Sequence, residues 1–230
     1  MTAPSRVVFL LDVDNTLLDN DRVERDLRSH LEQAFGPERE RRYWVIFEQL
    51  RSELGYADYL GALQRYRVEH PRDPHLLSVS SYLLEYPFAD RVYPGAVDLI
   101  QRLRRLGRTV ILSDGDVVFQ PRKVVRSGLW EAVDGHVLIY VHKEEMLEDV
   151  EQRYPSEHYV MVDDKLRILA AMKQVWGARL TTVFPRQGHY ATNPELTDAF
   201  PPADVSVENI ADLLADDLAS LLAAIEAGSR

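Results

Sequence analysis

Short apolar runs recur along the chain without the polar alternation of a half-exposed strand. Four of them lie at Val7–Leu11, Thr109–Leu112, Val137–Val141 and Tyr159–Val162. Runs of this length that lack alternation are typical of strands buried on both faces of a parallel sheet. Two further strands are predicted at Leu180–Phe184 and Asp204–Val207.

Polar side chains follow four of these runs directly, where each predicted strand ends. In chain order they are Asp12 and Asp14, Ser113 and Asp114, Lys143, and Asp163 and Asp164. The carboxyl ends of parallel strands meet at one edge of a sheet, and ligands bind there in open α/β folds. Two unit charges ~4 Å apart repel by about 4 kcal/mol at an effective dielectric near 20. Carboxylates gathered at one edge therefore favour a bound divalent cation.

The segment between the first two strands has helical periodicity instead. Its apolar residues repeat every three or four positions in three stripes, which Gly36-Pro37, Gly55 and Pro71 interrupt. The predicted helices span Val23 to Phe35, Trp44 to Leu54, Tyr56 to Tyr66 and Leu76 to Leu84. Four short amphipathic helices predict a small bundle inserted into an α/β domain. Its aromatic residues either pack this bundle or line a substrate pocket, and their spacing favours packing.

From Pro94-Gly95 onward, predicted helices alternate with strands. Helices are expected before the second strand, after Ser113, Lys143 and Lys165, and at the end of the chain from Glu208 to Ile225. Such alternation predicts an α/β fold with a doubly wound, Rossmann-like parallel sheet. The expected domains are an α/β catalytic core, residues 1–19 and 93–230, and an inserted helical cap, residues 20–92.

Composition narrows the classes of partner and chemistry. The formal net charge of −10 over 230 residues argues against binding to nucleic acid or to an anionic membrane. The absence of cysteine excludes disulfides, thiolate zinc sites and cysteine nucleophiles. The first residues lack the architecture of a signal peptide, and no stretch approaches the ~20 apolar residues of a membrane span. We therefore expect a soluble cytoplasmic protein, and the sequence does not indicate its oligomeric state.

The segment Asp12-Val13-Asp14-Asn15-Thr16 resembles the first signature of the haloacid dehalogenase superfamily, which is D-x-D-x-[TV] after a buried strand. The other elements follow in the family's order: Ser113 after the second strand, a lysine near the third, and paired acids after the fourth. The segment Tyr93–Ala96, which enters a helix, is also similar to this family. The resemblance covers essentially the whole chain and implies a phosphatase-like member with a helical cap.

The resemblance implies that Asp12 is a nucleophile that forms an aspartyl-phosphate, which splits ester hydrolysis into two easier steps. Asp14 lies two residues further, so its side chain leaves the same side of an extended backbone, and it is the implied general acid and base. Attack on a phosphate dianion needs a counter-charge, which Mg²⁺ supplies. The implied ligands are the Asp12 carboxylate, the Asp14 backbone carbonyl and the Asp164 carboxylate. Asp163 is the alternative ligand, and it and Thr16 are expected to support the site.

The phosphoryl oxygens need a hydroxyl group and a cation. Ser113 fits the first role, aided by the backbone N–H of Asp114. Lys143 lies just past the third strand, where the resemblance implies the phosphate-binding lysine, and Lys165 is the alternative. The remaining two lysines of the chain are expected to lie within helices, away from the site: Lys123 and Lys173.

The predicted function is Mg²⁺-dependent hydrolysis of a small phosphorylated metabolite. Dehalogenases of the family lack the second aspartate and need no metal, so Asp14 argues against that reaction. Phosphonate-cleaving relatives use a cap lysine, and no lysine precedes Lys123. A phosphomutase or phosphotransferase shares the same core residues and stays open. The alternative from another class is a non-catalytic binding module that has kept the fold.

Overall fold

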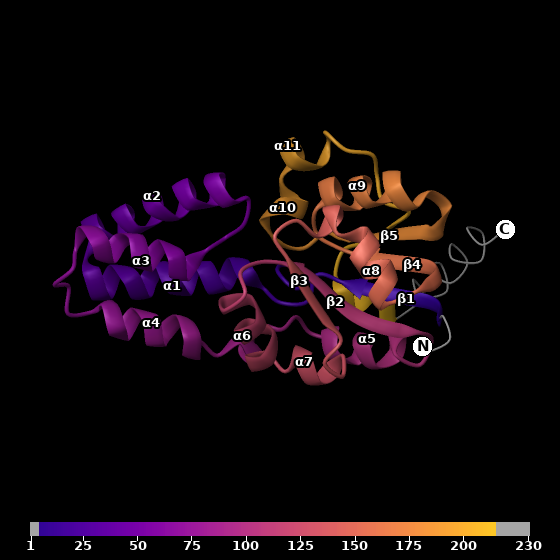
Figure 1. Ribbon diagram of the computed structural model, residues 1–230, viewed down its shortest axis with the longest axis horizontal. Helices are drawn as coiled ribbons and strands as arrows, with labels where there is room; N and C mark the ends of the chain where they lie inside the picture. The colour runs from indigo at the N-terminus through magenta and orange to yellow at the C-terminus, as the bar shows by residue number, and fades with distance from the viewer. Residues whose placement is uncertain (1–4, 215–230) are drawn as a thin grey trace.

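The computed structural model describes residues 5–214, which contain one six-stranded parallel sheet in the order β3-β2-β1-β4-β5-β6 (Figure 1). The strands are β1 Ser5–Leu11, β2 Arg108–Asp114, β3 Val137–Tyr140, β4 Ser156–Val162, β5 Leu180–Pro185 and β6 Val205–Val207. Strand β1 pairs with β2 on one side and with β4 on the other, so the strand order reverses beside β1. The prediction of a doubly wound α/β fold is confirmed, and the reversal is where such sheets place a ligand.

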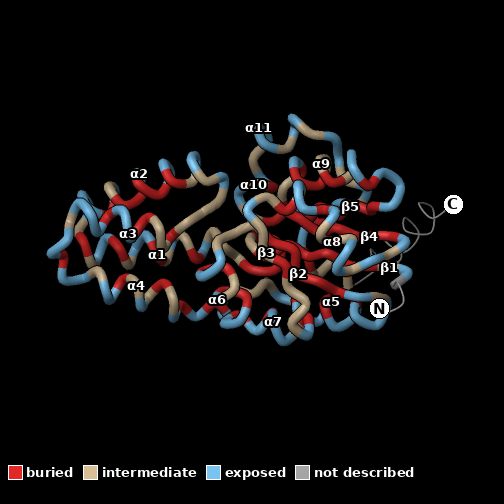
Figure 2. The backbone as a smooth tube through the Cα atoms, viewed as in Figure 1, coloured by how far each residue is buried: buried red, intermediate tan, exposed pale blue. Residues whose placement is uncertain are grey.

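Both faces of the sheet are apolar, which explains why the central strands show no polar alternation. In β1, Phe9 and Leu11 belong to one hydrophobic cluster, whereas Val8 and Leu10 belong to another on the opposite face. Figure 2 shows these strands as an almost continuous buried layer. Helices cover both faces: α5 Ala96–Leu103, α6 Phe119–Arg126 and α7 Leu129–Ala132 on the first, and α8 Leu147–Arg153 and α9 Leu166–Trp176 on the second.

Strand β3 differs from the sequence expectation of complete burial. It lies at the edge of the sheet and pairs with β2. Leu138 is buried, whereas Val137, Ile139 and Tyr140 are half-buried. An edge strand has a neighbour on one side only, so its side chains are covered less completely. The apolar run therefore predicted the strand correctly but overstated its burial.

The four predicted helices between β1 and β2 are present as α1 Asn20–Phe35, α2 Pro37–Leu54, α3 Tyr59–Glu69 and α4 Leu76–Glu85. We call them the cap helices. Figure 1 shows them packed together as a bundle beside the sheet rather than on either of its faces. Their ends follow from local sequence, because Asp19 and Asp58 accept backbone hydrogen bonds as N-caps of α1 and α3, and Gly55 ends α2 in a left-handed conformation.

Aromatic residues form much of the interior of the cap helices, as their helical spacing predicted. Tyr43 and Tyr66 are fully buried, and the Tyr43 hydroxyl donates a hydrogen bond to the Tyr59 carbonyl oxygen at 2.8 Å. The Tyr59 ring stacks on Phe47 with 4.7 Å between centroids and lies 5.2 Å from the ring of Phe119 in α6. Tyr59 therefore joins the interior of the bundle to the α/β core.

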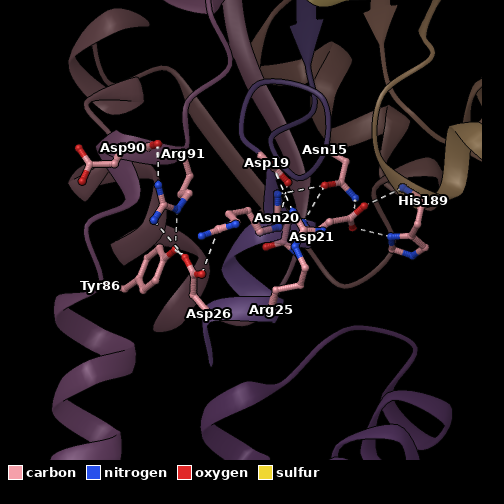
Figure 3. A network of polar contacts seen from close by, with 11 residues as sticks. Asn15, Asp19, Asn20, Asp21, Arg25, Asp26, Tyr86, Asp90, Arg91 and His189 are labelled. Atoms are coloured by element: carbon pink, nitrogen blue, oxygen red, sulfur yellow. Dashed lines mark hydrogen bonds and ion pairs between the residues drawn. The ribbon is translucent and has the colours of Figure 1, made fainter. Parts of the chain in front are cut away.

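The first connection between the core and the cap helices is fastened by a network around Asp21 (Figure 3). The Asn15 side-chain oxygen accepts hydrogen bonds from the backbone N–H groups of Asn20 and Asp21, at 3.0 and 3.1 Å. Asp21 in turn accepts from Asn15 Nδ2 at 2.9 Å and from the His189 backbone N–H at 2.8 Å. Gly188 adopts φ +72°, and a Cβ there would lie 2.5 Å from the Asn15 side chain, so this close approach requires glycine.

The second connection is fastened by Asp26, Tyr86 and Arg91, also visible in Figure 3. The Tyr86 hydroxyl donates to Asp26 Oδ2 at 2.6 Å, and Arg91 Nη2 donates to the same oxygen at 3.0 Å. Arg91 Nε donates to the Tyr86 hydroxyl at 2.7 Å. Each connection is therefore held by one carboxylate of α1 that accepts several hydrogen bonds.

The remaining elements complete the carboxyl-terminal part of the core. Helices α10 Gly188–Thr192 and α11 Pro194–Thr197 follow β5, and short 3₁₀ turns occur at Phe88–Arg91, Lys143–Glu145, Gly177–Arg179 and Ile210–Leu214. Of the terminal helix predicted from Glu208 to Ile225, the structure describes only the 3₁₀ turn Ile210–Leu214, and residues 215–225 lie outside the described residues. Within residues 5–214, no helix combines the length and the apolar character needed to cross a membrane.

Candidate active site

Asp12 and Asp14 leave the end of β1 into different surroundings. Asp12 is buried, and its Oδ1 accepts hydrogen bonds from Lys143 Nζ at 2.5 Å and from Ser113 Oγ at 3.3 Å. Its Oδ2 is buried without a hydrogen-bond partner. The Asp14 side chain is 27% exposed, and its Oδ1 lies 2.6 Å from Lys123 Nζ. One carboxylate is thus fixed at the floor of the site, and the other faces the space above it.

The chain turns sharply after Asp14, and this turn is tied to the neighbouring strand. The backbone N–H groups of Leu17 and Leu18 donate to the Val13 carbonyl oxygen at 2.9 and 3.0 Å. Asn15 adopts φ +59°, a left-handed conformation that asparagine tolerates. Thr16 Oγ1 accepts a hydrogen bond from the Asp164 backbone N–H at 3.1 Å. Thr16 therefore holds the turn against the loop after β4.

The paired acids after β4 point into the same buried space as Asp12. Asp163 Oδ2 lies 2.6 Å from Lys143 Nζ, and Asp163 Oδ1 accepts from the Lys165 backbone N–H at 2.9 Å. Asp164 is 1% exposed, and neither of its carboxylate oxygens has a hydrogen-bond partner. Ligand atoms of Asp12, Asp163 and Asp164 all lie within 4.8 Å of one another. Three carboxylates therefore converge on one point, and one of them is unsatisfied.

Burial explains the electrostatic state of these groups. Desolvation raises the pKa of Asp163 to about 6 and raises the pKa of Asp164 well above its ordinary value. Burial alone would lower the pKa of Lys143, but the carboxylates of Asp12 and Asp163 raise it above its ordinary value. The Lys143 ammonium therefore joins the nucleophile candidate, Asp12, to Asp163.

The residues of this site fit a divalent cation. The unpartnered oxygens belong to Asp12 and Asp164, and carboxylate oxygens are the ligands that Mg²⁺ prefers. The site has five carboxylates and three ammonium groups, so one divalent ion would balance its charge. The carboxylates are those of Asp12, Asp14, Asp114, Asp163 and Asp164, and the ammonium groups are those of Lys123, Lys143 and Lys165. Unpaired buried carboxylates are costly, and a cation between them would offset that cost.

Ser113 and Asp114, at the end of β2, lie beside Asp12 as their placement in the sequence predicted. Ser113 Oγ donates to Asp12 and accepts a hydrogen bond from Gln120 Nε2 at 3.0 Å. The Asp114 carboxylate accepts from the Lys143 backbone N–H at 2.8 Å, and burial raises its pKa. Asp114 therefore fixes the loop that carries Lys143.

Two residues of the site were missed by the sequence reasoning. Lys123 was expected to lie too far along a helix, but α6 begins only at Phe119, so its buried ammonium reaches Asp14 Oδ1. The same nitrogen donates to Asn20 Oδ1 at 2.9 Å. Gln120, one turn earlier on the same face of α6, donates to Asp14 Oδ2 at 3.3 Å. The spacing of Gln120 and Lys123 is the signal that could have found them, once a loop after Asp114 is allowed.

A cavity of about 330 Å³ opens above the carboxylates, between the cap helices and the core. Asp14, Gln120 and Lys123 line it from the core, Arg51 lines it from α2, and Tyr56 lines it from the connection between α2 and α3. It is large enough for a small metabolite, which places a candidate substrate space directly over Asp14.

A model of haloacid dehalogenase-like hydrolases matches residues 7–175 of the sequence. This chain belongs to the haloacid dehalogenase-like hydrolase family. A search of curated proteins finds no match. A solved haloacid dehalogenase-like hydrolase from Burkholderia xenovorans is 67% identical, with a TM-score of 0.88, over 92% of this chain and 98% of that one.

More distant members share the fold with this hydrolase. The magnesium-bound hydrolase YfnB of Bacillus subtilis is 18% identical, with a TM-score of 0.61, over 94% of this chain and 97% of that one. The L-2-haloacid dehalogenase of Xanthobacter autotrophicus with covalently bound chloropropionic acid is 18% identical, with a TM-score of 0.58, over 90% and 96%. At this identity the two structures support the fold alone.

Proposed function

We propose that this hydrolase is a Mg²⁺-dependent phosphatase that acts on a small phosphate monoester through an aspartyl-phosphate. The observation that carries the proposal is the second aspartate, Asp14, beside a buried carboxylate triad with unpartnered oxygens. A nucleophile alone would serve several reactions. A second carboxylate facing the cavity supplies the acid and base that ester cleavage needs.

In the proposed reaction, an Asp12 carboxylate oxygen attacks phosphorus, and the bond from phosphorus to the leaving oxygen breaks. Asp14 gives a proton to that leaving oxygen. Asp14 then takes a proton from a water molecule that attacks phosphorus, which releases phosphate and restores the Asp12 carboxylate. Each step conserves protons, because the proton that Asp14 donates is replaced by one from water.

The neighbouring residues orient and neutralise these groups. Lys143 holds Asp12 Oδ1 in place, and Ser113 Oγ and the Asp114 backbone N–H are proposed to bind phosphoryl oxygens. The Asp12 and Asp164 carboxylates and the Asp14 carbonyl would hold Mg²⁺, with Asp163 as supporting acid. The ion would supply positive charge against the phosphoryl oxygens. The cap helices are proposed to close over the substrate and exclude bulk water.

Particular residues disfavour two of the rival functions, a dehalogenase and a non-catalytic binding module. A dehalogenase has no use for a second carboxylate at the position of Asp14 or for a buried acid such as Asp164 whose oxygens lack partners. A phosphomutase or phosphotransferase would use the same residues, and it differs only in passing the phosphoryl group to an acceptor other than water. A binding module would not need a nucleophile candidate held by a buried lysine.

The test is hydrolysis of p-nitrophenyl phosphate with Mg²⁺ and with EDTA, beside release of halide from 2-chloropropionate. We expect phosphate release that requires Mg²⁺, no halide release, and a loss of about 10⁴-fold or more in kcat for Asp12→Asn. Activity that survives EDTA or the Asp12→Asn change would overturn the proposed mechanism. Halide release would instead identify a dehalogenase.

A further inference from the structure

Two cations from different parts of the chain converge on the ring of Tyr190 in the cavity. Lys165 Nζ, which follows the paired acids of β4, lies 4.8 Å from the centroid of this ring. The Arg51 guanidinium carbon, from the last turn of α2, lies 5.8 Å from the same centroid. All three residues line the cavity above Asp14. The core and the cap helices thus each contribute a positive charge to one place.

Neither cation is held by a short ion pair there, although, despite its burial, the more distant carboxylates of Asp164, Asp12 and Asp163 raise the pKa of Lys165. No carboxylate oxygen among the described residues lies within 4.0 Å of Lys165 Nζ. Arg51 has one acidic neighbour, Glu48, at 3.7 Å, and the Glu48 side chain is 61% exposed. Arg167, which also lines the cavity, is different, because Glu144 lies 2.5 Å from its guanidinium. Arg51 and Lys165 are therefore the cations of the cavity wall that remain available to a ligand.

The arrangement is electrostatically incomplete. Two positive charges near one ring repel each other, and the face of one aromatic ring is a weaker counter-charge than a carboxylate. The site below attracts phosphate through its own groups, so these two cations face a different part of any bound ester. An anionic group between them would complete the arrangement and would contact both the core and the cap helices.

We propose that Arg51, Lys165 and Tyr190 form a second anion site, so that the substrate is a phosphate monoester whose leaving group carries a further carboxylate or phosphate. This inference rests on the proposed phosphatase function and specifies its substrate class. The guanidinium and ammonium groups would bind that second anion through charge-assisted hydrogen bonds, and the Tyr190 ring would hold both cations at the cavity wall.

The test measures equilibrium binding to Asp12→Asn in the presence of Mg²⁺ by isothermal titration calorimetry. The probes are ω-carboxyalkyl phosphates of two to six carbons, each paired with the alkyl phosphate of the same length. A second series replaces the carboxylate by a phosphate, which distinguishes the two kinds of anion. We expect one chain length at which the doubly anionic probe binds at least about tenfold more tightly than its alkyl partner, a difference of about 1.4 kcal/mol.

Two variants and one control variant, all in the Asp12→Asn background, assign this preference. Arg51→Gln should reduce the ratio of the two dissociation constants to near one at that chain length. Arg65→Gln is the matched control, because Arg65 belongs to α3, pairs with Glu53 at 2.7 Å and does not line the cavity. It should leave the ratio unchanged. Lys165→Gln should also reduce the ratio, without any need for the variant to be active.

The outcomes separate this inference from the proposed function. If no doubly anionic probe binds more tightly than its alkyl partner at any length, the second anion site does not exist. If Arg65→Gln lowers the ratio as much as Arg51→Gln does, the preference comes from general charge, and the site is also rejected. A tenfold preference that depends on Arg51 supports the site even if the wild-type protein fails to hydrolyse any of the probes, a result that would count against the phosphatase reaction alone.

Discussion

Carboxylates in the cap region and carboxylates at the edge of the sheet differ in how many hydrogen-bond donors the chain gives them and in the direction of their pKa shifts. Asp73, near the start of α4, has a fully buried side chain that accepts hydrogen bonds from Arg39 and the Tyr66 hydroxyl, both at 3.0 Å. Burial alone would raise its pKa, but donors that include the His75 backbone N–H lower it. Asp164 is equally buried, has no hydrogen-bond partner, and has a raised pKa.

The same contrast holds for other carboxylates of the two regions. Although burial opposes the shift, hydrogen bonds lower the pKa values of Asp21 and Asp26, which fasten the connections to the cap helices. Desolvation raises the pKa values of Asp114 and Asp163 at the edge of the sheet. In the carboxylates that hold the structure together, donors from the chain thus outweigh burial, whereas at the candidate active site burial outweighs the donors, and Asp164 has none.

Asp14 lies between these two groups, because it faces the cavity and yet contacts Lys123 and Gln120. Lys123→Met should lower kcat about 100-fold with little change in KM, since the residue positions a group that acts on the leaving oxygen in the transition state. The measurement is steady-state hydrolysis of p-nitrophenyl phosphate with Mg²⁺. The control is Lys173→Met, which removes a partly exposed ion pair with Asp204. Equal effects of the two changes would show that Lys123 has no special role.

Replacing a carboxylate by an amide should have opposite effects in the two regions. Asp73→Asn should lower the free energy of unfolding by about 2 kcal/mol, because it weakens charge-assisted hydrogen bonds to a buried acceptor. Asp164→Asn should leave that free energy unchanged or raise it by about 1 kcal/mol in the absence of metal, because it removes an unpaired buried charge. Urea denaturation at pH 7.5 with EDTA measures both. A comparable loss in Asp164→Asn would mean that its carboxylate is satisfied.

The pH dependence of these differences should also have opposite signs. The folded-state pKa of Asp164 is raised, so the excess stability of Asp164→Asn over wild type is present at pH 7.5, shrinks as the pH falls toward 4.5, and is lost below about pH 4. The folded-state pKa of Asp73 is lowered, so the deficit of Asp73→Asn is constant over that range and shrinks only below about pH 4.

Each variant has to be compared with the wild type, because buried histidines also make the free energy of unfolding depend on pH. Burial lowers the pKa values of His30, His136 and His158, so acidification through their range destabilises every variant alike. Subtracting the wild-type curve from each variant curve cancels this contribution. A difference between Asp164→Asn and wild type that stayed constant from pH 7.5 to 4.5 would contradict the raised pKa.

The fold was predictable because its signals are local. The apolar runs ending at Leu11, Leu112 and Val162 predicted central strands, and the stripes between residues 23 and 84 predicted the four cap helices. The place of β3 at the edge was not predictable, since an apolar run does not reveal how many neighbours a strand has. Residues that directly follow a strand, such as Asp12 and Ser113, were brought together because parallel strands end at one edge.

The site residues that were missed depend on tertiary packing. Lys123 reaches Asp14 only because α6 begins five residues after the end of β2, which the sequence does not fix. Arg51 and Tyr190 lie together in the cavity although they are 139 positions apart in the sequence, because α2 and α10 both contribute to the cavity wall. No sequence periodicity links such positions, so the residues of the cavity wall could not be predicted from the sequence.

The most direct test of the central claim is a calorimetric titration of the metal-free protein with Mg²⁺ at pH 7.5. We expect one Mg²⁺ bound per chain in the wild type, and binding at least about 100-fold weaker in Asp164→Asn. Asp134→Asn, which alters a 73% exposed carboxylate, should bind Mg²⁺ as the wild type does. Wild-type affinity in Asp164→Asn, or no Mg²⁺ binding to the wild type, would contradict the assignment of these buried carboxylates to a metal site.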